Sequence, residues 1–286
     1  MTIEYDYNEA FSRNIGWVTE QEQQTLRNKK IAIAGMGGVG GEHLITLSRM
    51  GFGNFHISDM DSYELANFNR QAGASLPTIG HEKAATMERL AKELNPEMNV
   101  KNFDKGVNDE NLEEFLDGVD LYIDGLDFFV LGIRQKVFAR CWEKGIPAIT
   151  AAPLGMSTAL INFIPGKMSF EEYFGMEGLS PNEQQIKFYI GLSPSMLHAP
   201  YLVDESRIDF HNKKGPSTPM ACKLCAGVTA TEAVKILLNR GKVMAAPWGL
   251  QFDAFRNIYK KTWRPGGNNN PIQKLMFKIA KKKILG

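Results

Sequence analysis

The chain has 286 residues, of which 43% are hydrophobic, so it can bury a substantial core without a metal or a disulfide to hold it together. Its 33 basic and 32 acidic residues nearly cancel, which removes any global attraction for nucleic acid or membranes. Three cysteines are too few for a secreted disulfide scaffold, the N-terminus lacks a basic-then-apolar signal segment, and no apolar run approaches the roughly 20 residues that span a bilayer. We therefore expect a globular cytoplasmic protein and exclude an integral membrane protein.

The N-terminal part of the chain predicts a βαβ unit around a glycine-rich turn. An apolar strand over 30–34 breaks into the run Gly35-Met36-Gly37-Gly38-Val39-Gly40-Gly41, and a helix over 42–50 follows. The next strand covers 54–58 and ends on Asp59. These elements form the compact unit that is typical of a mononucleotide-binding half.

Helices and strands alternate on either side of this unit. The polar segment 20–29 is expected to be a helical lead-in, and further helices are predicted over 81–95, 109–116 and 132–144. Short apolar runs predict strands over 98–103, 120–124, 148–152 and 158–163. The predicted fold class is therefore α/β and Rossmann-like, with a mainly parallel sheet covered by helices on both faces.

The pattern weakens in the next segment. Residues 165–220 are punctuated by proline and rich in Met and Phe, so we expect an irregular crossover that serves function or a partner. A helix over 226–239, stopped by Gly241, and a strand over 250–263 follow, and they predict an antiparallel C-terminal extension of the sheet. The GGNNN tract at 266–270 is expected to be a linker.

The spacing Gly35-x-Gly37-x-x-Gly40 has a clear physical use. Small residues, Gly38 among them, let the backbone approach a phosphate, while the helix that follows directs its N-terminal N–H groups at the anion. Asp59 lies 19 residues past Gly40, where a ribose-binding acid belongs. Dinucleotide oxidoreductases carry the same turn and acid, so this feature alone leaves an NAD-dependent dehydrogenase open.

The segment that begins at Asp59 is more specific. It reads Asp59-Met60-Asp61-Ser62-Tyr63-Glu64-Leu65-Ala66-Asn67-Phe68-Asn69-Arg70-Gln71. This run resembles the D-x-D-x-V-x-x-x-N-x-x-R-Q signature of the ThiF/MoeB/HesA family of ubiquitin-activating-enzyme-like adenylyltransferases, with Tyr63 in place of the usual Val. Three further motifs match that family in order: Phe11-Ser12-Arg13-Asn14, Gly80-His81-Glu82-Lys83-Ala84 and Asp124-Gly125-Leu126-Asp127. The resemblance covers residues 11–155.

The resemblance implies an ATP site with a metal. Adenylation brings a carboxylate to the α-phosphate while pyrophosphate leaves, so cations are needed where the two anions meet. By resemblance, Asp59 holds the ribose hydroxyls, Arg70 and Lys83 bind the phosphates, and Asp127 holds Mg²⁺. Taken singly, Arg70 and Lys83 would be ordinary solvated charges and Asp127 a helix cap. Within the ordered set of motifs we assign all four to the site.

The resemblance also assigns the rest of the site. Asn67 and Gln71 complete the polar wall around the nucleotide, and Asp61 serves the metal, a water or only a turn. Arg13 reaches the γ-phosphate. In this family the equivalent arginine comes from the other subunit, so the resemblance implies a homodimer.

The chain departs from the family pattern after Asp127. The family commonly has Asn directly after its metal-binding Asp, whereas this chain has Phe128 and Phe129. The packing around the metal is therefore expected to differ. Arg134 on the next helix either lines the site or makes a structural salt bridge.

The cysteines leave several alternatives open. Many relatives bind structural zinc with two C-x-x-C pairs, but here only Cys222-Lys223-Leu224-Cys225 exists and Cys141 lies in a predicted helix, so a four-cysteine site is not expected. His198 or His211 would have to complete a mixed site, which we do not favour. As a thiolate at a helix start, Cys222 or Cys225 could accept an acyl group. Alternatively, both are small structural residues.

The segment 272–285 predicts a basic amphipathic helix at the C-terminal end. Ile272, Leu275, Met276 and Ile279 form one stripe among five lysines. Contact with an anionic membrane or with tRNA stays open. We favour a docking helix with a solvated basic face.

The sequence thus predicts an ATP- and Mg²⁺-dependent adenylyltransferase that activates a carboxylate, foremost the C-terminus of a ubiquitin-like sulfur carrier or of a peptide. The alternatives are a tRNA-modifying dehydratase of the same superfamily, an NAD-dependent oxidoreductase and an inactive dimeric scaffold. The expected parts are an ATP-binding half over 1–155, an acceptor-binding half of the same domain over 156–265, and the linker and basic helix over 266–286.

Overall fold

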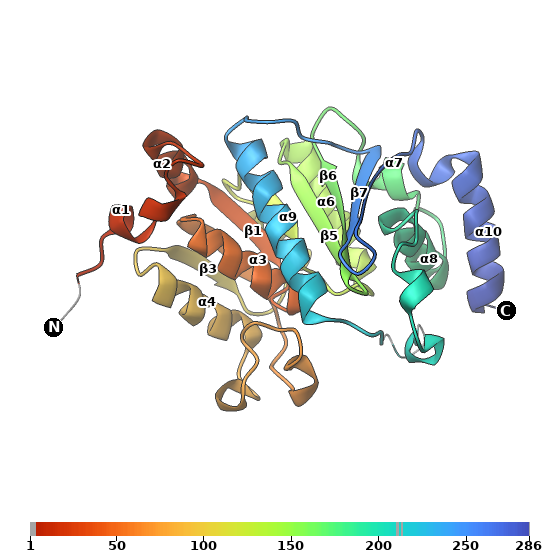
Figure 1. Cartoon of the computed structure of the whole chain (residues 1–286), viewed down its shortest axis with the longest axis horizontal. Helices are drawn as coiled ribbons and strands as arrows, with labels where there is room; N and C mark the ends of the chain where they lie inside the picture. The colour runs from red at the N-terminus through yellow and green to blue at the C-terminus, as the bar shows by residue number, and fades with distance from the viewer. Residues whose placement is uncertain (1–3, 210–211, 213, 286) are drawn as a thin grey trace. The chain divides into compact units, whose positions relative to one another are not determined.

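The structure is a computed structural model that describes residues 4–209, 212 and 214–285 (Figure 1). It contains two compact units. The first comprises residues 1–126 with 226–243, and the second comprises residues 127–225 with 244–286. None of the helices in the described part of the chain is long and apolar enough to cross a membrane.

The first unit contains four parallel strands. They lie in the order β3 (Asn99–Phe103), β2 (Asn54–Ser58), β1 (Lys30–Ala34) and β4 (Leu121–Asp124). The central strands β1 and β4 are buried along almost their whole length, as expected for parallel strands that present no polar side to water. The carboxyl ends of these strands meet at one edge of the sheet, and the predicted nucleotide motifs follow from that edge.

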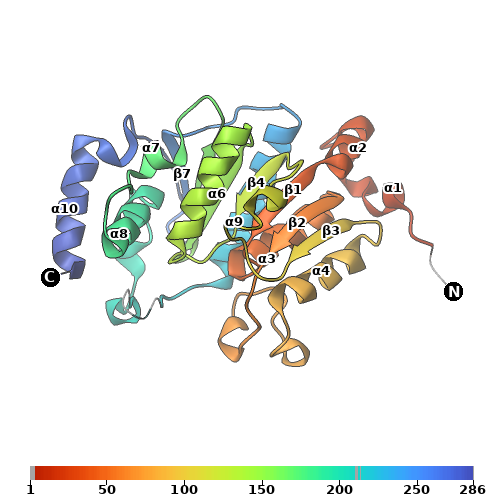
Figure 2. The ribbon, with the colours of Figure 1, turned by 180° about the vertical axis from the view of Figure 1, so that it is seen from behind.

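Helices connect the strands of the first unit. α3 (Gly38–Arg49) joins β1 to β2, and α4 (Lys83–Leu94) joins β2 to β3. These two helices pack side by side over one face of the strands (Figure 1 and Figure 2). The short α5 (Leu112–Phe115) joins β3 to β4, while α1 (Tyr7–Ala10) and α2 (Glu20–Asn28) precede the sheet. The part of α9 from residue 226 onward also belongs to this unit.

The second unit is built on antiparallel strands. β5 (Ala148–Leu154) and β6 (Ser157–Phe163) form a hairpin, β7 (Trp248–Asp253) pairs with β6, and β8 (Ile258–Trp263) pairs with β7. β6 is buried along its whole length, whereas most of β8 is exposed. Together with the parallel strands of the first unit, these strands confirm the Rossmann-like α/β fold class with its antiparallel C-terminal extension.

Aromatic rings fill the core of the second unit. Its helices are α6 (Leu131–Lys144), α7 (Phe170–Phe174), α8 (Pro181–Leu192) and α10 (Pro271–Leu285). Rings from α6, β6, α7 and α8 contact one another with centroids 4.3–6.3 Å apart, and they are Phe138, Phe163, Phe170, Phe174 and Phe188. α10 packs beside α8 at the outer side of this unit (Figure 1).

Three elements differ from the sequence prediction. The crossover over 165–220 is not irregular throughout, because it contains α7 and the 12-residue α8. The strand expected over 250–263 is the hairpin of β7 and β8, which turns at Asn257 with a φ of 55°. The helix expected to begin at 226 is α9 (Pro219–Leu237), which begins seven residues earlier. The C-x-x-C pair therefore lies within the helix.

The GGNNN tract is a packed turn rather than a linker. Asn268 is fully buried, donates to the carbonyl of Phe174 at 2.8 Å and accepts from Arg264. Gly267 has a φ of 56°, and a Cβ there would lie 2.3 Å from the Tyr173 carbonyl oxygen. These long-range contacts override the linker-like composition and fix the entry to α10.

Candidate active site

The glycine turn brings the ends of β1 and β4 into close contact. Gly35 follows β1 with a φ of 88°, and a Cβ there would lie 2.3 Å from the carbonyl oxygen of Gly125. At Gly40 a Cβ would lie 1.7 Å from the Gly35 oxygen. α3 begins at Gly38, and no side chain caps its first N–H groups. The turn therefore presents an open helix N-terminus of the kind that binds phosphate.

Asp59 fastens this turn to the end of β2. Its Oδ2 accepts the backbone N–H of Met36 at 2.6 Å, and its Oδ1 accepts the N–H of Asp61 at 2.8 Å. Burial raises the pKa of Asp59, against the lowering effect of these two bonds and of Lys83. Each carboxylate oxygen has two acceptor sites, so one on each oxygen stays available for a hydroxyl donor. This geometry suits the predicted ribose role.

Lys83 is held beside the same carboxylates. Its Nζ lies 3.0 Å from Asp61 Oδ2, and its backbone N–H donates to the Asp61 carbonyl at 2.9 Å. The side chain of Lys83 is 9% exposed, whereas that of Asp61 is 63% exposed. Asp61 thus positions a buried ammonium at the start of α4.

Arg70 and Asn67 lie on the turn that follows. Arg70 Nη1 donates to the Ala66 carbonyl at 3.1 Å and to Asn69 Oδ1 at 2.9 Å. Asn67 Oδ1 accepts the N–H of Glu64 at 2.9 Å, so this side chain closes the turn. Only Arg70 of the two carries a charge that a phosphate would attract.

Gln71 lies directly over the glycine turn. Its Nε2 is 3.8 Å from the point that a Cβ on Gly37 would occupy, and the side chain is buried. Its Oε1 has no hydrogen-bond partner among the described residues. An unpaired buried amide oxygen is costly and indicates a ligand or a water that pairs with it. The glycine cradle and this orphaned amide together fit a bound nucleotide.

Tyr63 and Gly73 form a contact that the motif comparison did not predict. Tyr63, which replaces the usual Val, is buried, and burial raises the pKa of its phenol. A Cβ on Gly73 would lie 2.2 Å from the Tyr63 hydroxyl and 2.9 Å from Met87 Sδ. The larger ring is accommodated because residue 73 has no side chain.

Arg13 lies at the opposite end of α3 from the glycine turn. The neighbouring Asn14 donates to the Met50 carbonyl at 3.2 Å, and Tyr7 donates to the Gly51 carbonyl at 2.6 Å, just past the end of α3. α3 has 12 residues and therefore spans roughly 18 Å. This length exceeds the reach of an arginine side chain, so Arg13 does not reach the glycine turn of its own unit.

Asp127 belongs to the second unit and is exposed. Its Oδ1 accepts the N–H of Phe129 at 3.0 Å, and its carbonyl accepts from Val130 N–H at 3.0 Å and from Arg134 Nη2 at 3.1 Å. Arg134 is 2% exposed, also donates to the Val130 carbonyl at 2.9 Å, and stacks 4.7 Å from the Phe188 ring centroid. Arg134 therefore braces the turn that carries Asp127.

Phe128 gives this turn a second anchor. Its ring contacts those of Phe129, Phe188 and Tyr189, with centroid distances of 5.0, 5.4 and 6.3 Å. The aromatic residue that replaces the family's Asn thus packs against α8.

The two cysteines of the C-x-x-C pair are buried in α9. Cys222 and Cys225 are 1% and 0% exposed, and Cys225 Sγ lies 3.2 Å from Thr158 Oγ1. Burial raises the pKa of the Cys225 thiol. A nucleophilic thiolate needs a lowered pKa and access, so this geometry favours the structural alternative.

His198 is buried as well. Its Nε2 lies 3.0 Å from the Tyr189 hydroxyl, and burial lowers its pKa. His211 lies outside the described residues. Within the described chain, no group of three or more His, Cys, Asp or Glu side chains is arranged to hold a metal. A single exposed carboxylate such as Asp127 suits Mg²⁺, which keeps waters and shares phosphate oxygens.

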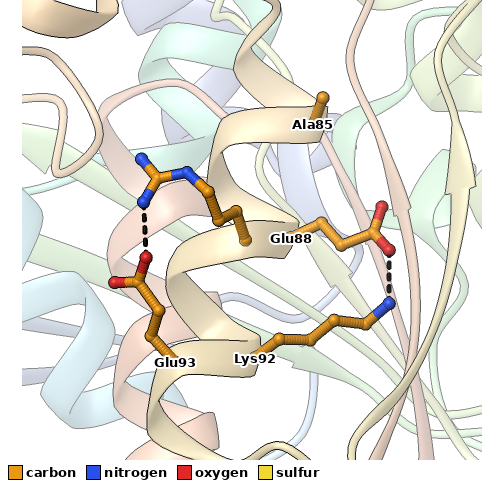
Figure 3. Close-up of a pocket in the computed structure, with 5 residues that line it drawn as sticks. Ala85, Glu88, Lys92 and Glu93 are labelled. Carbon is orange, nitrogen blue, oxygen red and sulfur yellow. Dashed lines mark hydrogen bonds and ion pairs between the residues drawn. The ribbon is translucent and has the colours of Figure 1, made fainter.

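A shallow pocket lies on the exposed face of α4 (Figure 3). Its lining residues are Ala85, Glu88, Arg89, Lys92 and Glu93. Arg89 pairs with Glu93 at 2.5 Å, and Lys92 pairs with Glu88 at 2.7 Å. These charges are satisfied along the helix, and none of the predicted site residues lines this pocket.

Comparison with known proteins identifies the family. The family model described as the ThiF family matches residues 11–271. The chain belongs to the ThiF family. This match confirms the resemblance drawn from the motifs. The relatives of the chain include the vegetative HesA protein of Trichormus variabilis, which is 27% identical over 149 residues.

Two curated relatives show the range of the family. A tRNA threonylcarbamoyladenosine dehydratase of Bacillus subtilis is 33% identical over 142 residues, which are 49% of this chain and 55% of that protein. The sulfur carrier protein ThiS adenylyltransferase of Escherichia coli is 27% identical over 143 residues, 50% of this chain and 56% of that protein. The chain thus spans about half the length of the curated relatives it matches.

Solved structures show the same fold. E. coli MccB with ATP covers 91% of this chain and 73% of its own, with a TM-score of 0.67 and 20% identity. The E. coli dehydratase TcdA covers 84% of this chain and 98% of its own, with a TM-score of 0.61 and 20% identity. At this identity the likeness concerns the fold alone.

Proposed function

We propose that this ThiF-family chain is an ATP- and Mg²⁺-dependent adenylyltransferase that joins AMP to a carboxylate and releases pyrophosphate. The proposed acceptor is the C-terminal carboxylate of a ubiquitin-like carrier protein or of a peptide. Relatives that are named adenylyltransferases, for ThiS and for molybdopterin synthase, support this class of reaction. MccB, which shares the fold, was solved with MccA as well as with ATP.

One observation carries the proposal. The glycine turn has no room for a Cβ at Gly35 or Gly40, is fastened by Asp59, and lies under the unpaired Oε1 of Gln71. An NAD site would also use a glycine turn and an acid. The buried Lys83 favours an ATP site over an NAD site, because the triphosphate of ATP carries more negative charge than the pyrophosphate bridge of NAD and needs more positive charge around it.

Each residue has a proposed role in this reaction. Asp59 accepts the ribose hydroxyls on the positions that its two backbone bonds leave free. Lys83 exchanges its bond to Asp61 for a phosphate oxygen, and Arg70 adds a second positive charge. Asp127 is the proposed Mg²⁺ ligand, on a turn that Arg134 braces. When bound, ATP supplies the α-phosphorus that the acceptor carboxylate attacks.

A homodimer is part of the proposal. Because Arg13 lies at the far end of α3, a helix roughly 18 Å long, it is proposed to serve a site in a second copy of the chain. Trp17 and Ile15 beside it are 83% and 39% exposed, which gives a second copy apolar surface to cover.

The nucleotide preference tests the proposal against an oxidoreductase. The purified chain is heated with ATP and Mg²⁺, with ATP alone, and with NAD. We expect the melting temperature to rise with ATP and Mg²⁺ and to stay unchanged with NAD, because binding to the folded state stabilises it by mass action. Stabilisation by NAD alone would exclude an adenylyltransferase.

The acceptor is tested by pyrophosphate exchange. Radiolabelled pyrophosphate enters ATP only when a true acceptor carboxylate is present, so a panel of carrier proteins and peptides with free C-termini is compared with amidated controls. The amidated forms should give no exchange. The chain would be an inactive scaffold if it binds ATP but catalyses pyrophosphate exchange with none of the acceptors, and if Asp127→Ala leaves its function unchanged.

The sequence relatives favour a second acceptor for the same panel. Three of them are named tRNA threonylcarbamoyladenosine dehydratases, at 31–33% identity. tRNA that carries a threonylcarbamoyl carboxylate is therefore included. Exchange with this tRNA and with none of the peptides would replace the carrier-protein proposal with an RNA-modifying one.

A further inference from the structure

The C-terminal helix α10 has three faces, which differ in their residues and in what they contact. Its first face packs on α8, where Gln273 is 7% exposed, the Phe277 ring lies 4.9 Å from Lys187 Nζ, and Lys281 pairs with Glu183 at 2.6 Å. Asn270 Oδ1 caps the helix by accepting the N–H of Ile272 at 2.9 Å. The helix is thus fixed on the second unit by one side only.

The second face is apolar and open to solvent. Ile272, Leu275 and Ile279 are 69%, 59% and 56% exposed. Their spacing of three and four residues places them on one stripe of the helix. This stripe was expected to dock on the protein, but the docking face consists of other residues, which leaves three aliphatic side chains uncovered.

The third face is basic. Lys274, Lys278 and Lys282 are exposed and form no ion pair within the described part of the chain. The 15 residues of α10 include five lysines and no Asp or Glu. Since the whole chain has a net charge of +1 and this helix contributes +5, the remainder has a net charge of −4. The helix is therefore strongly basic, whereas the rest of the chain has a small negative net charge.

We propose that α10 lies on the surface of an anionic lipid bilayer, with Ile272, Leu275 and Ile279 inserted among the acyl chains and the free lysines on the headgroups. An apolar stripe next to a basic face is the pattern of helices that bind in the plane of a membrane. Nucleic acid would satisfy the lysines but leave the aliphatic stripe exposed to water. An uncharged partner surface would cover the aliphatic stripe but would offer the lysines no opposite charge.

Vesicle sedimentation tests this surface with the full chain. Wild type is mixed with vesicles of phosphatidylcholine alone and with vesicles that also contain phosphatidylglycerol. Binding is expected to the second kind only and to weaken as salt is raised, because salt screens the attraction. No binding to the anionic vesicles, or equal binding to both kinds, would overturn the proposal.

Two sets of substitutions assign the binding to α10. Leu275→Ser with Ile279→Ser removes the apolar stripe, and Lys274→Gln, Lys278→Gln and Lys282→Gln remove the charge. Each set is expected to lower the bound fraction at least about ten-fold. All five positions are exposed, so the melting temperature should be unchanged and should show that the variants fold.

Control substitutions of the same chemical kind are made elsewhere in the second unit. Val203 is 99% exposed, and Lys260 and Lys261 lie on the exposed strand β8. Val203→Ser, and Lys260→Gln with Lys261→Gln, are expected to leave vesicle binding intact. A loss in these controls equal to that of the α10 variants would contradict the proposal.

Two further outcomes would also overturn it. If Leu275→Ser with Ile279→Ser changes the mass of the protein in solution, the stripe is covered by a second copy. If the lysine variants lose affinity for tRNA while vesicle binding is unaffected, the basic face serves RNA. The rise in melting temperature with ATP and Mg²⁺ is measured on the same variants. If this rise is kept while vesicle binding fails, the failure concerns α10 and not the proposed adenylation.

Discussion

At the scale of single residues, two buried polar side chains differ in whether they have hydrogen-bond partners. His43 lies on α3 and is fully buried, and neither ring nitrogen has a partner in the described structure. Burial lowers the pKa of His43 from 6.5 to about 3. Arg134 is almost as buried but is fully engaged with backbone carbonyls and a ring. The first residue is a source of pH sensitivity and the second a source of rigidity.

His43 makes the folded chain sensitive to acid. The unfolded chain binds the proton near pH 6.5, whereas the folded chain resists it down to about pH 3, so stability present above pH 6.5 is lost as the pH falls through that window. By pH 5 this loss amounts to about 2 kcal/mol. His43→Leu is expected to remove that part of the pH dependence in urea unfolding measured from pH 8 to pH 5. The difference between variant and wild type should be constant above pH 7, and a parallel course down to pH 5 would contradict the assignment.

Arg134 is expected to be structural for the turn that carries Asp127. Arg134→Met keeps much of the side-chain volume but removes the charged donor that the carbonyls of Asp127 and Val130 share, which should cost about 3 kcal/mol of unfolding free energy. Arg140→Met on the same helix is the control, because the Arg140 side chain is 34% exposed and pairs with the exposed Glu143 at 2.7 Å. Its cost should stay below about 1 kcal/mol. Equal losses in the two variants would show that Arg134 has no special role.

At the scale of elements, the strands of the first unit were the easiest to predict. β1 occupies the predicted residues 30–34 because its residues 31–34 form an uninterrupted apolar run that ends at the glycine turn, as is typical of a buried parallel strand. α8 was missed since it is buried on several sides, with Gln185 and Lys187 among its buried residues, and so shows no clean polar face. Its position depends on tertiary contacts that no local pattern contains.

The glycine turn is the element whose sequence requirement is strictest. In Gly40→Ala the new Cβ would lie 1.7 Å from the Gly35 oxygen, so the turn must open, with an expected loss of about 2–4 kcal/mol and of stabilisation by ATP. Gly132→Ala in α6 is the matched control, because nothing lies within 4 Å of its Cβ. This change should raise stability by about 0.5–1 kcal/mol, since alanine favours the helix. Thermal melts with and without ATP compare the two variants.

The candidate site shows what sequence motifs reveal and what they leave out. Asp59 and Gln71 were assigned to the site by their place in the motif, but the bond from Met36 to Asp59 and the unpaired amide over Gly37 depend on how the turn folds back. The GGNNN tract shows the reverse error, because composition indicates flexibility where Asn268 is in fact a buried hydrogen-bonding centre. Motifs predict which residues matter more readily than they predict what each one contacts.

At the scale of the whole molecule, the position of Arg13 makes the proposed activity a property of two chains. Arg13 is placed by Asn14 and its bond to Met50, at the far end of α3 from the glycine turn. In the proposed dimer, each site would use Asp59 from one copy and Arg13 from the other.

Mixed dimers test this arrangement without knowledge of the acceptor. Arg13→Ala and Asp59→Ala homodimers are each expected to bind a non-hydrolysable ATP analogue at least about ten-fold more weakly than wild type, since each lacks one charged contact at every site. In a dimer of one Arg13→Ala chain and one Asp59→Ala chain, purified through two different tags, one site carries both lesions and the other carries neither. Titration calorimetry should then find one tight site per dimer, because the intact site takes Asp59 from the Arg13→Ala chain and Arg13 from its partner. If Arg13 instead acted within its own chain, both sites of the mixed dimer would be damaged and no tight site would return.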